Sequence, residues 1–125
     1  MTKATAEPTD AQLDVAAATF DLLSVPSRLH LVVILAQGEF DVQTLADRTR
    51  QLLPAASQQL AKLRAAGIVA ARRDGRRQMY RVDDPHILAV IGQMFSHIAP
   101  DGTLAAGQPG RPRSRNPRFT ATSAL

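Results

Sequence analysis

The stretch of residues 53–80 constrains the fold of this chain more than any other part of the sequence. Pro54 and Gly67 enclose a helix-favouring segment, because proline suits the first turn of a helix and glycine suits the position after the last. Asp74-Gly75 lies between two strand-like segments, and Asp-Gly is a strong signal for a hairpin. The predicted elements are a helix over residues 54–66 and strands over residues 68–72 and 78–82.

The predicted helix has two unlike faces at the 3.6-residue helical period. Ala56, Leu60 and Leu63 recur at i, i+4 and i+7, and we expect them to pack inward. A second face has no large apolar group and is expected to point outward. Its residues are Ala55, Gln58, Gln59 and Lys62. A surface helix of this kind beside an arginine-tipped hairpin is the layout of a winged helix-turn-helix that binds DNA.

Charge is distributed unevenly, although the net charge of the whole chain is only +4. Residues 1–47 carry two cations and seven acids, a balance of −5, whereas residues 48–81 carry nine cations and one acid, a balance of +8. The remaining residues contribute +1. We therefore expect the positive potential on the outward helix and the hairpin, where the phosphates of a nucleic acid would lie.

Composition excludes several classes of protein. The chain has no cysteine, which rules out disulfides and thiolate metal sites and fits an intracellular protein. No segment is long and apolar enough to span a bilayer and no signal peptide is evident, so we expect a cytoplasmic location and no membrane partner. The sequence also lacks a glycine-rich phosphate loop and a Ser/His/acid grouping, so an enzyme is not expected.

The rest of the chain predicts a mainly helical fold around the small hairpin. Apolar spacing, Asp41 as an N-cap and prolines at helix starts give the boundaries. The predicted helices are 10–23, 26–38, 42–49 and 85 to about 98. The predicted regions are a mobile arm over 1–9, one winged helix-turn-helix domain over 10–99 and a disordered basic tail over 100–125. In the helix from Pro26, the predicted inward residues are Leu29, Val32, Val33 and Ala36, and we expect a packing role for His30.

The first and last helices have more apolar surface than a small monomer can readily cover. Leu13 and Phe20 belong to such a stripe on the first helix, and Val90, Met94 and Phe95 belong to one on the last. A homodimer that pairs these helices is the simplest explanation.

Several short motifs, taken in their order along the chain, resemble those of a known protein family. They are Ser27-Arg28-Leu29, Thr44-Leu45-Ala46, Ala56-Ser57-Gln58-Gln59-Leu60-Ala61-Lys62-Leu63, Ala66-Gly67-Ile68-Val69, Arg73-Asp74-Gly75-Arg76 and Tyr80-Arg81-Val82. Over about residues 12–98 the chain thereby resembles the ArsR/SmtB family of winged-helix repressors. The resemblance implies a dimer paired through its first and last helices, and repression that an inducer, usually a metal ion, relieves. The chain departs from the family at Gln59, usually His, and at Arg50, where Gly is frequent.

The outward residues predict how operator DNA would be contacted. Gln58 and Gln59 can form bidentate contacts with adenine, and Ala55 can touch a thymine methyl group. Ser57 can bond to a phosphate or a base, and Lys62 is expected at a phosphate. The wing arginines would hold the backbone or enter the minor groove. They are Arg72, Arg73, Arg76 and Arg77. Four tail arginines could add nonspecific affinity, and they are Arg111, Arg113, Arg115 and Arg118.

Asp84, His86 and His97 form a candidate metal site near the last helix. The two histidines are about 16 Å apart along a helix with a 1.5 Å rise per residue. One ion cannot bridge them within a chain, because zinc binds imidazole at about 2.0–2.1 Å. If two copies of the helix pair antiparallel, Asp84 and His86 of one chain come level with His97 of the other.

The same ligand pattern resembles the last-helix site of metal-sensing family members, which have a fourth ligand three residues after the second histidine. Pro100 stands at that position, so the fourth ligand would be water, Asp101 or nothing. Nitrogen and oxygen ligands suit zinc, cobalt or nickel, with one ion per subunit. Alternatively, His86 caps the helix start and His97 lies on the dimer surface without a metal.

The sequence thus favours a dimeric, sequence-specific transcriptional repressor that a divalent metal derepresses. Two alternatives remain open. One is a repressor of the same fold without metal sensing, and the other is a winged-helix module that binds protein or RNA.

Overall fold

The structure is a computed structural model in which residues 6–104 are described. The chain divides into two compact units, Met1–Asp84 and Pro85–Leu125. Residues 1–5 of the predicted arm and residues 105–125 of the predicted tail lie outside the described residues, and so do the four tail arginines.

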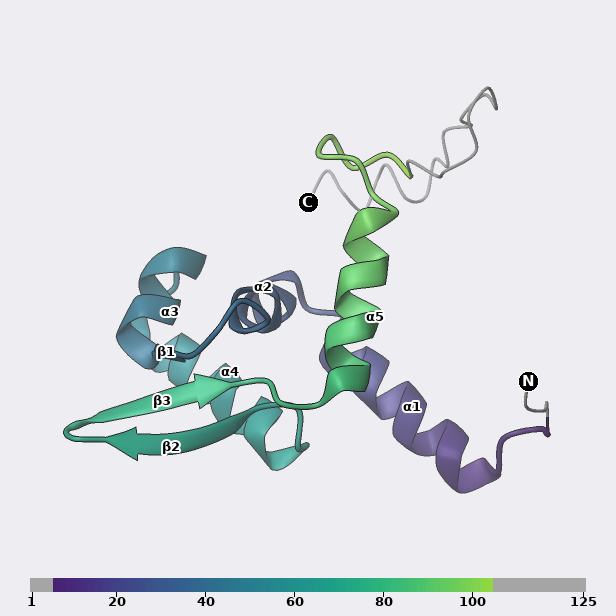
Figure 1. Cartoon of the computed structure of the whole chain (residues 1–125), viewed down its shortest axis with the longest axis horizontal. Coiled ribbons are helices and arrows are strands. Elements are labelled where there is room, and N and C mark those ends of the chain that lie inside the picture. Colours follow the sequence, from purple (N-terminus) through teal and green to yellow (C-terminus); the bar gives the residue numbers. More distant parts are fainter. Residues whose placement is uncertain (1–5, 105–125) are drawn as a thin grey trace. The chain divides into compact units, whose positions relative to one another are not determined.

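From residue 6 on, where the structure is described, the first unit contains four helices and three short strands (Figure 1). In chain order they are α1 (Asp10–Leu22), α2 (Pro26–Leu35), β1 (Phe40–Asp41), α3 (Val42–Thr49), α4 (Leu53–Ala65), β2 (Ala70–Asp74) and β3 (Arg77–Arg81). The second unit contains α5 (Pro85–Ser96). This mainly helical architecture with a small antiparallel hairpin confirms the predicted fold class.

Local sequence signals explain where the helices begin. Thr9 caps α1 through a reciprocal pair of hydrogen bonds with Gln12, at 2.8 and 3.1 Å. Asp41 caps α3, because its Oδ1 accepts a 2.9 Å bond from the backbone amide of Thr44, as predicted.

The end of α4 explains why the strands start later than predicted. Gly67 has a φ of 81°, and the amide of Ile68 donates to the carbonyl of Leu63 at 2.9 Å. This bond closes the last helical turn in a Schellman motif. Ile68 and Val69 therefore belong to the helix cap, and β2 begins only at Ala70.

The turn between α3 and α4 ends α3 in the same way, but with an arginine in place of glycine. Arg50 has φ 56° and ψ 43°, and the amide of Gln51 donates to the carbonyl of Ala46 at 2.9 Å. A left-handed conformation costs a residue with a side chain roughly 1–2 kcal/mol. The surrounding turn must therefore hold Arg50 in this conformation.

The core of the first unit lies among α2, α3 and α4, beneath the hairpin. Its largest fully buried side chains are Leu31, Val32, Leu35, Leu45, Leu60 and Leu63. The predicted inward face of α2 was partly wrong, because Ala36 is exposed whereas Leu31 and Ile34 are buried. His30 is exposed on α2.

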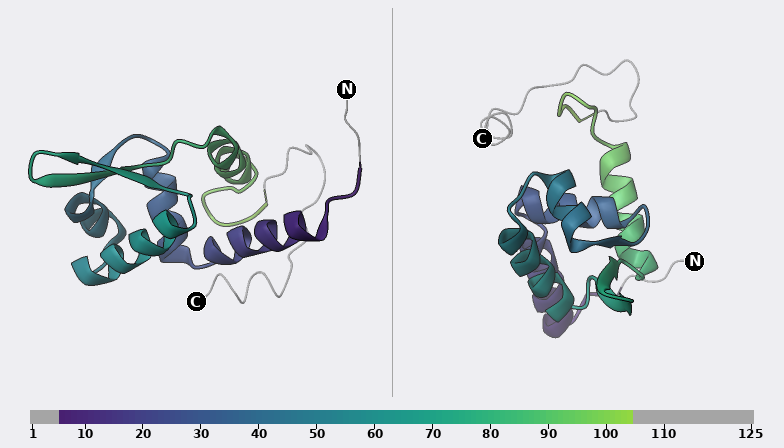
Figure 2. Two further views of the ribbon diagram at one scale, coloured as in Figure 1. Left: turned by 90° about the horizontal axis from the view of Figure 1, so that it is seen from below. Right: turned by 90° about the vertical axis from the view of Figure 1, so that its left-hand side faces the viewer.

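The sheet has the strand order β1-β3-β2, and all its pairs are antiparallel. Asp74 pairs with Arg77 at the hairpin turn, which confirms the Asp-Gly prediction. The strand β1 was not predicted; it pairs Phe40 with Tyr80. Figure 2 shows the β2–β3 hairpin reaching past the helices of this unit as a wing.

The helices α1 and α5 leave much apolar surface uncovered. No residue of α1 is buried, and Ile91 is the buried residue of α5. Residues after α5 form a tight turn, in which the amide of Ala99 donates to the carbonyl of Thr103 at 2.7 Å. No single helix of residues 6–104 has the length and apolarity to cross a membrane; α1 and α2 meet both criteria only as a pair bent by 97°.

Candidate nucleic-acid interface

The helix α4 separates a packing face from an outward face. Ala56, Leu60 and Leu63 are fully buried, as the periodicity predicted. Four of the five predicted DNA-contact residues on α4 are exposed. They are Ala55, Ser57, Gln58 and Lys62. The helix thus presents hydroxyl, amide and ammonium groups outward, from a backbone that its buried leucines hold in place.

Gln59 does not belong to this outward face, so its predicted placement was wrong. Its side chain is half-buried, and its Nε2 donates a 2.8 Å hydrogen bond to Oγ of Ser27 at the start of α2. Its Oε1 is buried and has no hydrogen-bond partner among the described residues. Gln59 therefore ties α4 to α2, whereas Gln58 one position earlier points to solvent.

On the wing, Arg72 forms an ion pair with Glu39, the residue that precedes β1. Its Nε lies 2.9 and 3.1 Å from the two carboxylate oxygens of Glu39, and its Nη2 lies 2.7 Å from Oε1. This bidentate pair lowers the pKa of Glu39 and raises that of Arg72. The hydrogen bonds from Thr44, with a smaller effect of Arg77, likewise lower the pKa of Asp41.

Two further wing cations have acidic neighbours. Arg77 Nε lies 3.7 Å from Oδ2 of Asp41, and Arg81 lies 2.9 Å from Asp83 and 3.7 Å from Glu39. The predicted separation of charge was therefore too sharp, because the fold brings Glu39 and Asp41 of the acidic segment onto the basic hairpin.

Arg73 and Arg76 differ from these paired arginines. Both are exposed, and neither forms an ion pair within residues 6–104. Of the four predicted wing contacts, these two flank Asp74-Gly75 at the hairpin turn and have no ion pair among the described residues.

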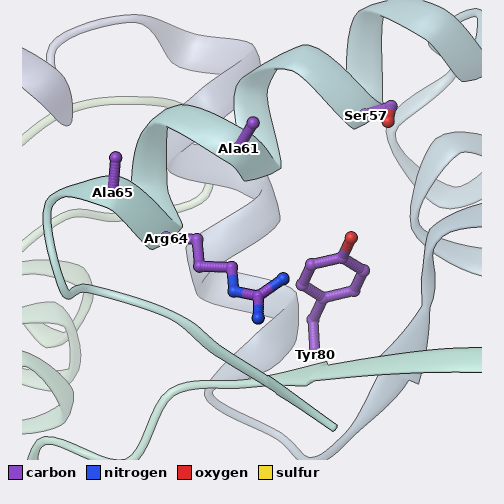
Figure 3. A pocket seen from close by; sticks show the side chains of 5 residues that line it. All are labelled: Ser57, Ala61, Arg64, Ala65 and Tyr80. Atoms are coloured by element: carbon purple, nitrogen blue, oxygen red, sulfur yellow. The ribbon is translucent and has the colours of Figure 1, made fainter. Parts of the chain in front are cut away.

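A groove between α4 and the wing was missed by the sequence analysis. It has a volume of about 490 Å³ and is lined by Ser57, Ala61, Arg64, Ala65 and Tyr80. Figure 3 shows the guanidinium of Arg64 beside the ring of Tyr80, with Ser57 nearer the start of α4. The helical spacing of the four α4 residues could have revealed their common face. The facing position of Tyr80 depends on the hairpin register.

The candidate metal ligands do not gather within one chain. No group of three His, Cys, Asp or Glu side chains suited to a metal occurs in residues 6–104. Asp84 and His86 each take part in a polar interaction, so neither is a free ligand. His97 lies just beyond the end of α5, and it lines a hollow of about 470 Å³ on that helix with Ala89, Val90, Gln93 and Met94.

The fold, the outward face of α4 and the arginine-tipped wing define a winged helix-turn-helix protein of the DNA-binding class. The family described as "Bacterial regulatory protein, arsR family" matches residues 25–71. This chain belongs to that family, which confirms the resemblance of its motifs.

Two curated relatives illustrate the similarity. The biofilm growth-associated repressor of Agrobacterium fabrum is 39% identical over 83 residues, which are 66% of this chain and 71% of the relative. The HTH-type transcriptional repressor SmtB of Mycobacterium tuberculosis is 33% identical over 89 residues, which are 71% of this chain and 66% of the relative. The chain spans slightly under two thirds of the length of SmtB, and less than half of another mycobacterial regulator. These descriptions as regulators agree with the expectation that the chain is not an enzyme.

Among solved structures, the homodimeric winged helix-turn-helix DNA-binding domain of a possible ArsR-family regulator from Mycobacterium bovis superposes with a TM-score of 0.65. It is 34% identical, and the match covers 74% of this chain and 88% of that domain.

Proposed function

We propose that the protein is a homodimeric repressor of transcription that acts in the cytoplasm and binds operator DNA through α4. The exposed polar face of α4 is the observation that supports this proposal most. Its side chains are suited to contacting DNA bases, and the opposite face of α4 is fully buried and holds the helix in place. The relatives described as repressors support the regulatory role.

In this function the residues of α4 have distinct roles. Gln58 would form a bidentate contact with adenine, and Ala55 would touch a thymine methyl group. Ser57 and Lys62 would contact phosphates. Gln59 would act indirectly, because its hydrogen bond to Ser27 helps to fix the orientation of α4 relative to α2.

The wing would add mostly electrostatic affinity. Arg73 and Arg76 are available to phosphates or to the minor groove. Arg72 and Arg77 would contact DNA only by exchanging Glu39 and Asp41 for phosphate oxygens. We therefore expect the two tip arginines to contribute more to affinity than the two that are paired.

Fluorescence anisotropy tests the DNA-binding function. The full chain is titrated into a duplex that it has enriched from a randomised library and into a random duplex, each at two salt concentrations. We expect affinity for both duplexes to fall with salt and a preference for the enriched duplex to persist. Equal affinity for both duplexes, or tighter binding to single-stranded RNA, would favour the alternative of a winged-helix interaction module.

We further propose that a divalent metal controls binding from a site shared by two protomers. Asp84 and His86 of one subunit and His97 of the partner subunit would hold it, and their nitrogen and oxygen donors fit zinc, cobalt or nickel. An ion bound there would link the two protomers and so bias their relative placement. Within residues 6–104 of a single chain the three ligands do not come together, so this proposal depends on the dimer.

Calorimetric titration of zinc, cobalt and nickel into the dimer tests this second proposal. We expect one ion per subunit, and His97→Ala should remove that binding, whereas His30→Ala, at an exposed histidine on α2, should not. Full metal affinity in His97→Ala would exclude this site. The protein would then be a repressor without metal sensing at these residues.

A further inference from the structure

The groove between α4 and the wing contains a cation without an acidic counterpart. Arg64 is exposed at the end of α4 and forms no ion pair within the described part of the chain, residues 6–104. None of the five residues that line the groove is acidic. Arg64 thus differs from Arg72 and Arg81, whose positive charges face Glu39.

The polar groups of this groove are well suited to an anion. A guanidinium carries five N–H donors, and the hydroxyls of Ser57 and Tyr80 can each donate one hydrogen bond. Ala61 and Ala65 have only methyl side chains, which leave room beside the helix. The groove therefore combines positive charge, neutral donors and space, which together favour a small tetrahedral anion.

The position of the groove between α4 and the wing indicates that the anion belongs to the DNA backbone. Ser57 lines the groove and also belongs to the exposed face of α4, so the groove adjoins the proposed base-reading surface. Tyr80 lies on β3, the central strand of the sheet that carries the wing. A duplex that contacts both α4 and the wing must carry its sugar-phosphate backbone across the space between them.

We propose that this groove seats one phosphate of the DNA backbone, held by Arg64 with the hydroxyls of Tyr80 and Ser57. The proposal rests on the proposed DNA-binding function and adds Arg64 and Tyr80 to its contacts. Arg64 supplies the charge, and Tyr80 fixes the position of the phosphate against the wing. The contact determines how α4 is aligned in the major groove, and it carries no sequence information itself.

Two substitutions separate charge from positioning. Arg64→Gln should weaken binding about tenfold for both enriched and random duplexes, because a phosphate contact is independent of sequence. It should also reduce the slope of log affinity against log salt by about 0.9 for each lost phosphate contact. Tyr80→Phe should weaken binding about threefold and leave the slope unchanged, since a neutral hydroxyl releases no counterion.

The phosphate itself is located by chemical substitution in the enriched duplex. Neutral methylphosphonates replace the phosphates one at a time, and the affinity of each duplex is measured. One position in each half-site should weaken binding of the wild type and should have no effect on Arg64→Gln. Arg76→Gln is the matched control: it removes the same charge from the wing tip and should keep the wild-type sensitivity at that position.

Three outcomes would overturn the inference. If Arg64→Gln keeps the affinity and salt slope of a wild type that binds the enriched duplex, the phosphate seat is wrong and the proposed function stands. If the wild type binds no duplex, both are wrong. If no methylphosphonate position that weakens binding of the wild type loses its effect in Arg64→Gln, Arg64 does not contact the backbone and the phosphate seat is wrong.

Discussion

The central helices α2, α3 and α4 and the terminal helices α1 and α5 carry similar apolar side chains but bury them very differently. Leu31, Leu45 and Leu60 of the central helices are 0% exposed. By contrast, Leu13 and Phe20 of α1 are 53% and 62% exposed. The central helices satisfy their apolar faces within one chain, whereas the terminal helices do not.

This difference indicates two levels of organisation. Within one protomer, α2 and α3 pack against α4 and hold it in place, and the burial of their apolar side chains stabilises this part of the fold. The terminal helices expose aromatic and aliphatic groups to water, which agrees with the proposal that they form an interface between protomers. The following substitutions test this comparison in order of decreasing effect.

The largest effect is expected at the centre of the core. Leu60→Ala should destabilise the protein by about 2–5 kcal/mol, because it leaves a cavity beneath α4. Leu52→Ala, at a residue that is 79% exposed, is the matched control and should change stability by less than about 0.5 kcal/mol. Urea unfolding followed by circular dichroism measures both. Equal effects would contradict the assignment of Leu60 to the core.

A charge on the terminal helix should break the dimer and spare the fold. Phe20→Glu should raise the dimer dissociation constant about a hundredfold, because an unpaired carboxylate would have to enter an apolar interface. Ala18→Glu adds the same charge on the other side of α1 and should leave the dimer intact. Sedimentation equilibrium gives the dissociation constants, and circular dichroism checks the helices. Unchanged dimerisation of Phe20→Glu would remove α1 from the interface.

The two adjacent glutamines of α4 should respond differently. Gln58→Ala should remove about 1–3 kcal/mol of preference for the enriched duplex and leave affinity for random DNA unchanged. Gln59→Ala should instead cost about 1 kcal/mol of folding stability, because it breaks the bond to Ser27. Anisotropy and urea unfolding on both variants give the comparison. A loss of sequence preference only in Gln59→Ala would reverse these roles.

The smallest effect concerns the wing acids and depends on pH. The pKa of Glu39 is lowered from its ordinary 4.5 in the folded protein. The contribution of Glu39 to folding stability is therefore fully present above pH 4.5, and it is lost as the pH falls through the lower pKa of the folded state. Glu39→Gln should therefore be slightly less stable than the wild type at neutral pH, and the difference should vanish in acid. Arg72→Gln removes the partner of this carboxylate and should behave alike. The free energy of unfolding, measured from neutral to acidic pH, checks both variants. If the curves of stability against pH run parallel for the wild type and the variants, this role of Glu39 is contradicted.

The elements that sequence predicted well are those whose signals are local. The i, i+4 and i+7 spacing of α4 identified its buried face because small and polar residues stand between the leucines. In α2 the same method failed, since every position from Leu29 to Leu35 except His30 is apolar and no face stands out. The strand β1 has only two residues and no strand pattern to detect.

The parts of the site that sequence missed depend on contacts between distant segments. Glu39 reaches Arg72 across 33 positions and Gln59 reaches Ser27 across 32, and neither pair has a local pattern. Two neighbouring glutamines therefore looked equivalent, although only Gln58 is exposed. The groove with Arg64 and Tyr80 likewise exists only once the hairpin folds beside α4.

The arrangement of the DNA site that the protein selects is the most direct test of the central claim. A randomised duplex library is enriched with the full chain, and the retained duplexes are sequenced. Two copies of α4 related by two-fold symmetry should select an inverted repeat whose half-sites are centred about 10 base pairs or a multiple apart, with adenines facing Gln58. Enrichment of a single unrepeated half-site, or of no sequence at all, would contradict the account.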